Sequence, residues 1–464
     1  MSKMKTRLTS VALATLLLAG CAHGPVDKAA EVALPTAWSQ AGGDAMPDWA
    51  GLLDPTLAAL QARALEANRD IALAAQRWKR AQLLADQGAL RWTPNAGLST
   101  NASRPLETKS TTRNVDVGGV TIPVTSSTGV TRSYGANVGV GYELDLWDRL
   151  GQTQAAQRAN AEAARTDIAA ARLSIRSQVA EAYWTLASLR ARQPLADTQL
   201  AITRETLELT RARVREGKLL PIELDKIAAT VQAAENRLTD LAADTLLQRQ
   251  RLALLLDEPL PGPSPDAALP ANAPPQWRLA EPADVLARRP DVQSARLGVD
   301  AALARLRASE AERYPRLSFS AGIGTGGSQA RDWLSQPLAS LGANLVVPMI
   351  DWQRLALSRD GARTELDTAA LTLRDTLNKA LADIEAQRIE ADRLTQQLTA
   401  NNGRLREAVE NERLATLRYE AGAIARADWL QARSARLDAE QNRIQLRAQQ
   451  WVRQAGLFKA LGGA

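Results

Sequence analysis

The fold is decided by a stretch in the first third of the chain that reads Tyr134-Gly135-Ala136-Asn137-Val138-Gly139-Val140-Gly141-Tyr142-Glu143-Leu144-Asp145-Leu146. Aromatic and aliphatic side chains occupy every second position, while Asn137, the glycines and Glu143 fall between them. This alternation predicts a β-strand with one apolar and one polar face. A strand of ~10–13 residues crosses a bilayer when it is tilted, and glycine and charge on the minor face are typical of a watery lumen. The alternative is a half-exposed hairpin of a soluble protein.

Three further stretches carry the same kind of pattern. Residues 95–104 form a shorter predicted partner strand, which a Ser/Thr/Gly-rich loop at 105–132 separates from the first. In the second half, residues 317–324 alternate clearly and residues 341–350 less cleanly. The sequence therefore predicts four membrane strands in each chain.

The strands belong to a sequence unit that occurs twice. Asn68-Arg69-Asp70-Ile71 recurs as Arg289-Pro290-Asp291-Val292, and Trp147-Asp148-Arg149-Leu150 recurs as Trp352-Gln353-Arg354-Leu355. The same order of elements surrounds both sets of motifs, so the chain is an internal duplication. We expect a first repeat over 54–256, a proline-rich linker over 257–282 and a second repeat over 283–464.

Each repeat is dominated by helix. An alanine-rich helical stretch at 55–90 or 283–312 comes first, and one very long helix follows the strands, at 148–216 or 352–420. At 1.5 Å per residue, ~68 helical residues extend roughly 100 Å, which suits a rod or a tube and not a globular core. Leucine and alanine recur at alternating spacings of four and three over 366–398, within the second long helix, and over 224–255, which follows the first long helix. This is the pattern of coiled-coil seams.

The N-terminus carries an export signal. Basic residues precede an apolar run that is too short to span a bilayer, which needs ~20 residues. The run ends in Leu18-Ala19-Gly20-Cys21, which resembles the bacterial lipobox, so we expect residues 1–20 to be removed and Cys21 to be acylated. Residues 21–53 are then an anchor and an extended segment. The alternative is ordinary signal cleavage beside an incidental cysteine.

Composition excludes several kinds of site. The 464 residues include one His and one Cys, both near the N-terminus, which excludes internal disulfides, His-based metal sites and Ser-His-Asp or Cys-His catalytic sets. A glycosidase-like pair of carboxylates stays formally open. The net charge of +6 is small, and Arg and Glu alternate along helices, so we expect solvated helix faces and no nucleic-acid partner. We expect no enzyme activity, no metal and no cofactor beyond the lipid on Cys21.

Four strands cannot close a membrane barrel, because the smallest such barrels use eight. An open edge in lipid leaves backbone N–H and C=O groups unpaired, at a cost of several kcal/mol each. Two copies would give eight strands and a barrel filled by side chains, whereas three would give twelve and a water-filled lumen. The polar, glycine-rich face favours three copies. We therefore expect a membrane α+β protein in which a homotrimer shares a 12-stranded β-barrel, continued by a long α-helical coiled-coil barrel.

Two motifs place this architecture beside a known family. They read Gly141-Tyr142-Glu143-Leu144-Asp145-Leu146-Trp147-Asp148-Arg149 and Arg288-Arg289-Pro290-Asp291-Val292. With Tyr314-Pro315 and a glycine after each long helix, the chain resembles the TolC-like outer membrane efflux proteins. Within that family it is similar to the NodT-like lipoproteins that serve resistance–nodulation–division (RND) pumps.

The resemblance implies the outer membrane channel of a tripartite efflux pump in a Gram-negative bacterium. The channel would be a passive exit duct for drugs or other small toxic compounds, with a periplasmic adaptor (membrane fusion protein) and an inner-membrane RND pump docked at its periplasmic tip. Type I secretion exporters share the fold and remain an alternative. A coiled-coil envelope lipoprotein without a pore is the other rival, but it leaves the alternating strands unexplained. The sequence does not reveal the substrate.

The resemblance also implies a gate just beyond the glycines, where carboxylates narrow the periplasmic end. Glu223 and Asp428 each lie six residues after a hairpin glycine, and three copies would form rings of like charge. Arg426 is a candidate partner of Asp428. The family often has a second acid where this chain has Gln431, so the acidity of the constriction is in question. The alternative is that both acids only favour the dipole of a first helical turn.

Two further sets of residues complete the candidate sites. Gly217 and Gly422 suit left-handed helix caps, and with Lys218 and Ala423 they mark the hairpin tips at which an adaptor would dock. Aromatic residues at the strand–helix junctions are candidates for the membrane–water interface. These are Trp92, Trp147, Tyr314 and Trp352.

Overall fold

The computed structural model describes Trp38, Trp49 and residues 54–103, 110–127, 133–275, 277, 279–327, 337–348 and 350–463. The predicted signal segment 1–20 and the predicted acylation site Cys21 lie outside these residues. In the part of the chain that is described, no helix is apolar over a length sufficient to cross a bilayer.

Each half begins with two helices and not with the single helical stretch that the sequence predicted. In the first half, α2 (Pro55–Ala67) and α3 (Arg69–Leu90) are separated by Asn68, which has an extended backbone. In the second half, α6 (Pro282–Arg288) and α7 (Pro290–Ala311) are separated by Arg289, also extended. The repeated motifs around Asn68 and Arg289 are therefore helix breaks.

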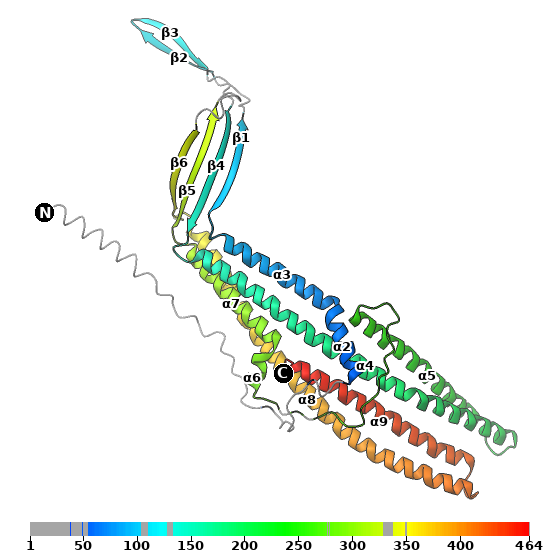
Figure 1. Cartoon of the computed structure of the whole chain (residues 1–464). Helices are drawn as coiled ribbons and strands as arrows, with labels where there is room; N and C mark the ends of the chain where they lie inside the picture. The colour runs from blue at the N-terminus through cyan, green and yellow to red at the C-terminus, as the bar shows by residue number, and fades with distance from the viewer. Residues whose placement is uncertain are drawn as a thin grey trace. The chain divides into compact units, whose positions relative to one another are not determined.

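The long helices agree with the sequence prediction. The first half contains α4 (Arg149–Arg215), which reverses into α5 (Pro221–Leu256), and the second half contains α8 (Trp352–Glu420), which reverses into α9 (Arg426–Ala460). α4 packs against α5, α7 and α9, and α8 packs against α7 and α9 (Figure 1). The predicted seams face these neighbours, because their leucines and alanines are buried or half-buried.

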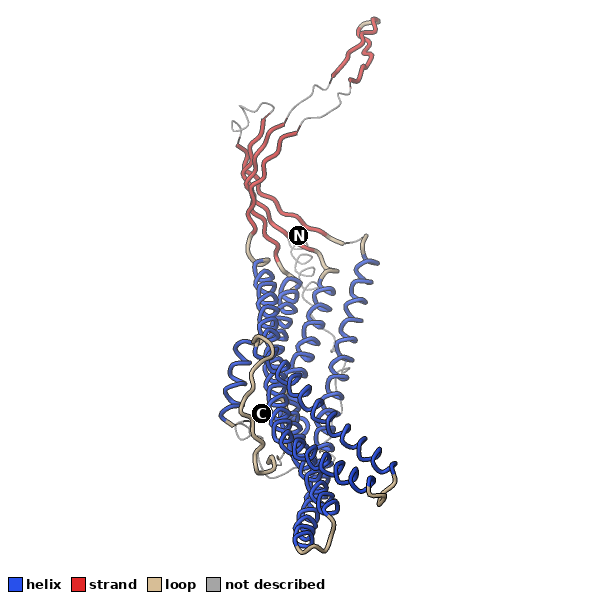
Figure 2. The backbone as a smooth tube through the Cα atoms, turned by 90° about the vertical axis from the view of Figure 1, so that its right-hand side faces the viewer, coloured by secondary structure: helices blue, strands red, loops and turns tan. Residues whose placement is uncertain are grey.

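Four strands form one antiparallel sheet in the order β1-β4-β5-β6. They are β1 (Asn95–Ser103), β4 (Ser133–Leu144), β5 (Arg316–Gly327) and β6 (Pro337–Val346). Figure 2 shows these strands continuing from the ends of the helices. The predicted strand at 341–350 is wrong in position: pairing with β5 begins at Pro337 and ends at Val346, and Pro348 lacks the N–H that a longer ladder requires.

The predicted loop at 105–132 contains a second, two-stranded sheet. In it β2 (Ser110–Val117) pairs with β3 (Val120–Ser127) across Gly118 and Gly119, both of which have positive φ. The signal was present in the sequence, since two glycines between alternating apolar residues are typical of a tight hairpin turn. The number of strands predicted for the chain was therefore too low, although the main sheet has the predicted four.

The main core lies where α2, α4, α5 and α9 meet. Tyr183 and Trp184 of α4 are almost fully buried, and the Trp184 ring lies 5.2 Å from the ring of Trp451 on α9. The Tyr183 hydroxyl donates a hydrogen bond of 2.5 Å to Asp54 at the start of α2. Burial and this bond raise the pKa of Tyr183. The cluster therefore joins α2 to α9 through α4.

Candidate functional site

One face of the main sheet is apolar and uncovered. Leu98, Val138 and Ile323 lie side by side across β1, β4 and β5, and these residues are 72%, 54% and 63% exposed. In the next row Val140 pairs with Ala321, which pairs with Leu341 on β6. Water is a poor solvent for such a surface, and a face of this kind is suited to lipid.

The opposite face carries small and polar residues. Gly97, Gly139, Gly322 and Ser340 form one continuous row across the four strands. The alternation predicted from residues 134–146 thus continues in these rows from β4 into the neighbouring strands. A row of small residues leaves open space on this side, as a wide lumen requires.

The sheet has two open edges among the described strands. β1 has nine residues and β6 has ten, and each pairs with a neighbour on one side only. The outer N–H and C=O groups of both strands are left for another chain or for solvent.

The Glu143–Arg149 segment connects the end of β4 to the start of α4. The Asp145 carboxylate accepts hydrogen bonds from the backbone N–H of Arg149 at 2.7 Å and of Gly151 at 3.0 Å, which caps the helix. Asp148 adopts a left-handed backbone with φ 59°, and Arg149 pairs with Glu143 at 2.6 Å. The acidic residues of this segment therefore fix the direction in which the helix leaves the sheet.

The junction aromatics do not all behave alike. The Trp147 indole N–H donates to the carbonyl oxygen of Pro315 at 2.9 Å, and its ring stacks on Tyr314 at 4.8 Å. Trp92 donates to Gln154 on α4 at 3.1 Å. The structure thus brings Trp147 and Tyr314 together from different halves, while Trp352 is 67% exposed.

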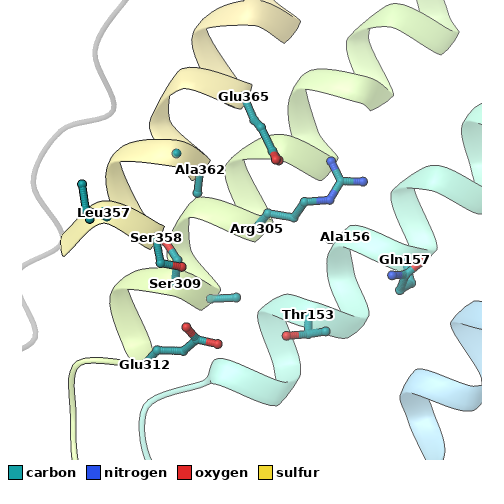
Figure 3. A pocket seen from close by; sticks show the side chains of 12 residues that line it. Thr153, Ala156, Gln157, Arg305, Ser309, Glu312, Leu357, Ser358, Ala362 and Glu365 are labelled. Atoms are coloured by element: carbon teal, nitrogen blue, oxygen red, sulfur yellow. The ribbon is translucent and has the colours of Figure 1, made fainter. Parts of the chain in front are cut away.

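A polar groove of about 390 Å³ lies between α4, α7 and α8, close to the strand junctions. In Figure 3 the side chains of Arg305 and Glu312 extend from α7 and that of Glu365 extends from α8. Gln157, Leu357 and several small residues such as Ala362 line the remainder. Within the described ranges, no group of three His, Cys, Asp or Glu residues could hold a metal ion.

The two hairpin tips share one cap geometry. Gly217 and Gly422 both have φ +74°, which confirms the predicted left-handed caps. The N–H of Lys218 bonds to the Arg213 carbonyl at 2.8 Å, and that of Ala423 bonds to the Arg418 carbonyl at the same distance. Lys218 also pairs with Glu216 at 2.7 Å, and this bond lowers the pKa of Glu216.

The predicted gate residues lie in the first turns of α5 and α9. Glu223 pairs with Lys226 at 2.7 Å on its own helix. Asp428 and Gln431 line a groove between α8 and α9. These placements leave both acids on the hairpins, close to the tips.

The predicted partner of Arg426 was wrong. Its guanidinium forms an ion pair with Glu205 of α4 and not with Asp428, because α4 packs directly beside the start of α9. The hydrogen bond and charge of Glu205 raise the pKa of Arg426. Sequence reasoning missed Glu205, since nothing local to it indicates contact with a residue so distant in the chain.

Sequence reasoning also missed the roles of Asn68 and Arg289. The Asn68 amide donates to the carbonyl oxygen of Leu255 at 3.0 Å, and the Arg289 guanidinium donates to that of Ala460 at 2.6 Å. Both acceptors lie at the end of a return helix, α5 or α9. The repeated motif quoted from the sequence thus fastens the helix break of each half to the end of its return helix by a hydrogen bond.

Comparison with known proteins agrees with this geometry. A family model described as outer membrane efflux protein matches residues 60–258 and 282–463. The chain is 29% identical to the pyoverdine export outer membrane protein OpmQ of Pseudomonas aeruginosa, over 99% of this chain and 97% of that protein. It is 23% identical to nodulation protein T of Rhizobium leguminosarum bv. trifolii, over 95% and 93%.

Among solved structures, the MtrE outer membrane channel of Neisseria gonorrhoeae superposes with a TM-score of 0.78 at 21% identity, covering 96% of this chain and 98% of that one. At this identity the likeness supports the fold alone. The family model spans most of the chain, in two blocks that each hold one set of helices and strands. The chain belongs to the outer membrane efflux protein family.

Proposed function

We propose that three copies of this chain form the outer membrane channel of a tripartite efflux pump. The observation that carries the proposal is the four-stranded sheet, which combines an uncovered apolar face, a row of small residues on the other face and two open edges. Pairing β6 of one copy with β1 of the next removes every edge and gives twelve strands. A water-filled lumen and a lipid-facing outside follow from that closure.

The remaining assignments rest on the same arrangement. The chain would be divided into repeats at 54–256 and 283–464 with a linker at 257–282. Cys21 would carry the lipid that adds to anchoring in a Gram-negative outer membrane. A pore-free rod is disfavoured, since it would leave the apolar face of the sheet in water.

The helical hairpins would form the periplasmic part. Gly217-Lys218 and Gly422-Ala423 would meet the periplasmic adaptor of an inner-membrane RND pump. Glu223 and Asp428, with Arg426 and Gln431 nearby, would narrow the periplasmic end. Trp352, together with the packed Trp92, Trp147 and Tyr314, would lie near the membrane–water interface.

The cargo is proposed to be a small organic compound that the pump selects. One relative is described as exporting pyoverdine, which is consistent with small-molecule export. We propose no catalytic role, because the relatives are channel and transport proteins.

The channel is tested by mass and by conductance. Detergent-extracted protein should have the mass of three chains and should conduct ions in planar bilayers. Glu223→Ala combined with Asp428→Ala should raise the single-channel conductance, since it removes two rings of charge. The matched control is Asp225→Ala with Glu420→Ala, which removes two exposed acids of the same hairpins.

A monomeric protein without conductance would refute the channel. A trimer whose conductance and ion selectivity are unchanged in the Glu223/Asp428 variant would remove only these residues from the gate.

A further inference from the structure

Near its turn, one side of the hairpin formed by β2 and β3 is aliphatic beyond Arg113. In its register Val115 pairs with Ile122, Val117 with Val120, and Arg113 with Val124. Paired residues and residues two apart lie on the same face of a sheet, so five β-branched aliphatic side chains share one face. These five residues are between 39% and 63% exposed.

The other side of the same hairpin is polar. There Asn114 pairs with Pro123, and Asp116 with Thr121. Gly118 and Gly119 supply the two positive φ values of a tight turn, 63° and 79°, so the register is fixed. A two-stranded sheet is only marginally stable in water, and one with a bare apolar face requires a cover.

The chemistry of the hairpin disfavours a lipid surface as the cover. Segments that lie on membranes are rich in Trp, Tyr, Lys or Arg, but residues 110–127 contain no aromatic residue and no Lys. Their charges are limited to Arg113 and Asp116. Flat rows of Val and Ile pack well against another sheet of the same kind.

The position of the hairpin in the chain points to a second copy. It is inserted between β1, an edge of the main sheet, and β4. Ser103 pairs with Ser133 at the end of the sheet that is remote from the helices, and their hydroxyl oxygens lie 2.6 Å apart. The two connections between the main sheet and the hairpin therefore leave from one point. Residues 104–109 and 128–132 number six and five, so at ~3.3–3.6 Å per residue each connection reaches at most ~20 Å.

In the proposed channel, β1 is the strand to which the neighbouring copy attaches, so each hairpin begins at an interface between copies. Three of them emerge at the same, outer end of the barrel. We propose that the apolar faces of the three β2–β3 hairpins pack against one another across the outer mouth and narrow the exit. This inference rests on the proposed trimer and adds to it a second constriction, built from Val115, Val117, Val120, Ile122 and Val124.

Disulfide trapping in isolated outer membranes tests the contact. Val117→Cys and Val120→Cys place a thiol on the apolar face, and Asp116→Cys and Thr121→Cys place one on the polar face of the same turn. The parent chain has Cys21 alone and serves as the background. After mild oxidation, the apolar-face variants should give covalent dimers at a yield at least ~10-fold above that of the polar-face variants. The product is a dimer because only two of three thiols at a threefold axis can join in a disulfide.

Single-channel conductance provides a second test of the contact between hairpins, and it requires no introduced cysteine. Val120→Asp should increase the single-channel conductance because like charges separate the hairpins, while Thr121→Asp on the polar face should leave it unchanged. Trimer mass is measured on every variant. If the variants are trimeric but their apolar-face thiols fail to cross-link, the proposed contact between hairpins is wrong and the proposed channel still stands. If the parent chain does not have the mass of a trimer, the proposed function is refuted.

One further outcome would also overturn the inference. A tryptophan introduced as Val117→Trp should not be quenched by brominated lipids in reconstituted vesicles. Strong quenching would mean that the bilayer, and not another copy, covers the apolar face.

Discussion

The two halves of the molecule fasten their return helices at matching places with different chemistry. Asn68 and Arg289 stand at equivalent helix breaks, and each donates to the last turn of the return helix, at Leu255 in α5 and at Ala460 in α9. An amide is sufficient in the first half, where it also caps α3 through the N–H of Asp70 at 2.9 Å.

In the second half the donor is the charged guanidinium of Arg289, which requires more hydrogen-bond and ion-pair partners than an amide. The Arg289 side chain is 11% exposed and forms two hydrogen bonds with Asp291, at 3.1 and 2.9 Å, and a longer one with Asp383 at 3.4 Å. Gln178 stands in α4 where Asp383 stands in α8. The fold thus requires a donor at this point, while a buried guanidinium additionally requires carboxylates around it.

Replacement of the charged fastening should have the largest effect. Arg289→Ala leaves the Ala460 carbonyl and two carboxylates without their donor and should cost about 3 kcal/mol of unfolding free energy. Asn68→Ala removes a cap and one buried hydrogen bond and should cost about 2 kcal/mol. Guanidinium titration of detergent-extracted protein, followed by helical circular dichroism, measures both. Arg288→Ala, at an exposed neighbour, is the control, and equal costs at Asn68 and Arg289 would show that the charge adds nothing.

The repeated tryptophans offer a second contrast between the halves. Trp147→Leu removes the bond to Pro315 and the stack on Tyr314, so it should cost about 2 kcal/mol. Trp352→Leu, at the equivalent but exposed position, should cost less than about 0.5 kcal/mol in the same detergent titration. Similar losses at both positions would contradict the contrast.

The hairpin glycines should behave identically in both halves. Gly217→Ala and Gly422→Ala each place a Cβ on a left-handed residue with open space around it, so each should cost about 1 kcal/mol through backbone strain alone. Gly403→Ala, inside α8 and equally uncrowded, should stabilise the helix by about 0.5–1 kcal/mol. A cost at one tip that is twice that at the other would show that the tips differ in strain.

The smallest expected effect is a pH dependence confined to the second half. Burial raises the pKa of Asp291, but the bonds and charge of Arg289 outweigh it and leave that pKa below its ordinary value. Such a group stabilises the fold above the unfolded-state pKa of ~3.9, and the contribution disappears as the pH falls through the folded-state value. The stability difference between the parent and Arg289→Ala should therefore narrow below about pH 4, whereas that for Asn68→Ala should not change. Unfolding titrations at pH 6 and pH 3 make the comparison.

Local pattern was sufficient for the elements that repeat along one stretch of chain. The long helices match their predicted spans, the strand at Ser133–Leu144 has the predicted faces, and the left-handed caps lie at Gly217 and Gly422. Each depends on the chemistry of neighbouring residues, such as the side-chain period or the steric freedom of glycine. The β2–β3 hairpin was equally local but was missed, because its serines and threonines concealed the alternation around Gly118-Gly119.

The sequence by itself determined the duplication, the coiled-coil seams and the two-faced strands, since these are periodicities that one stretch of chain carries alone. Only the tertiary structure decided that Arg426 pairs with Glu205, that Trp147 stacks on Tyr314, and that Asn68 and Arg289 fasten the return helices. Each of these contacts joins residues that are distant in the chain. Their pairing depends on which helix faces and strand ends the packed chain brings within a few ångströms, and no local spacing encodes that proximity.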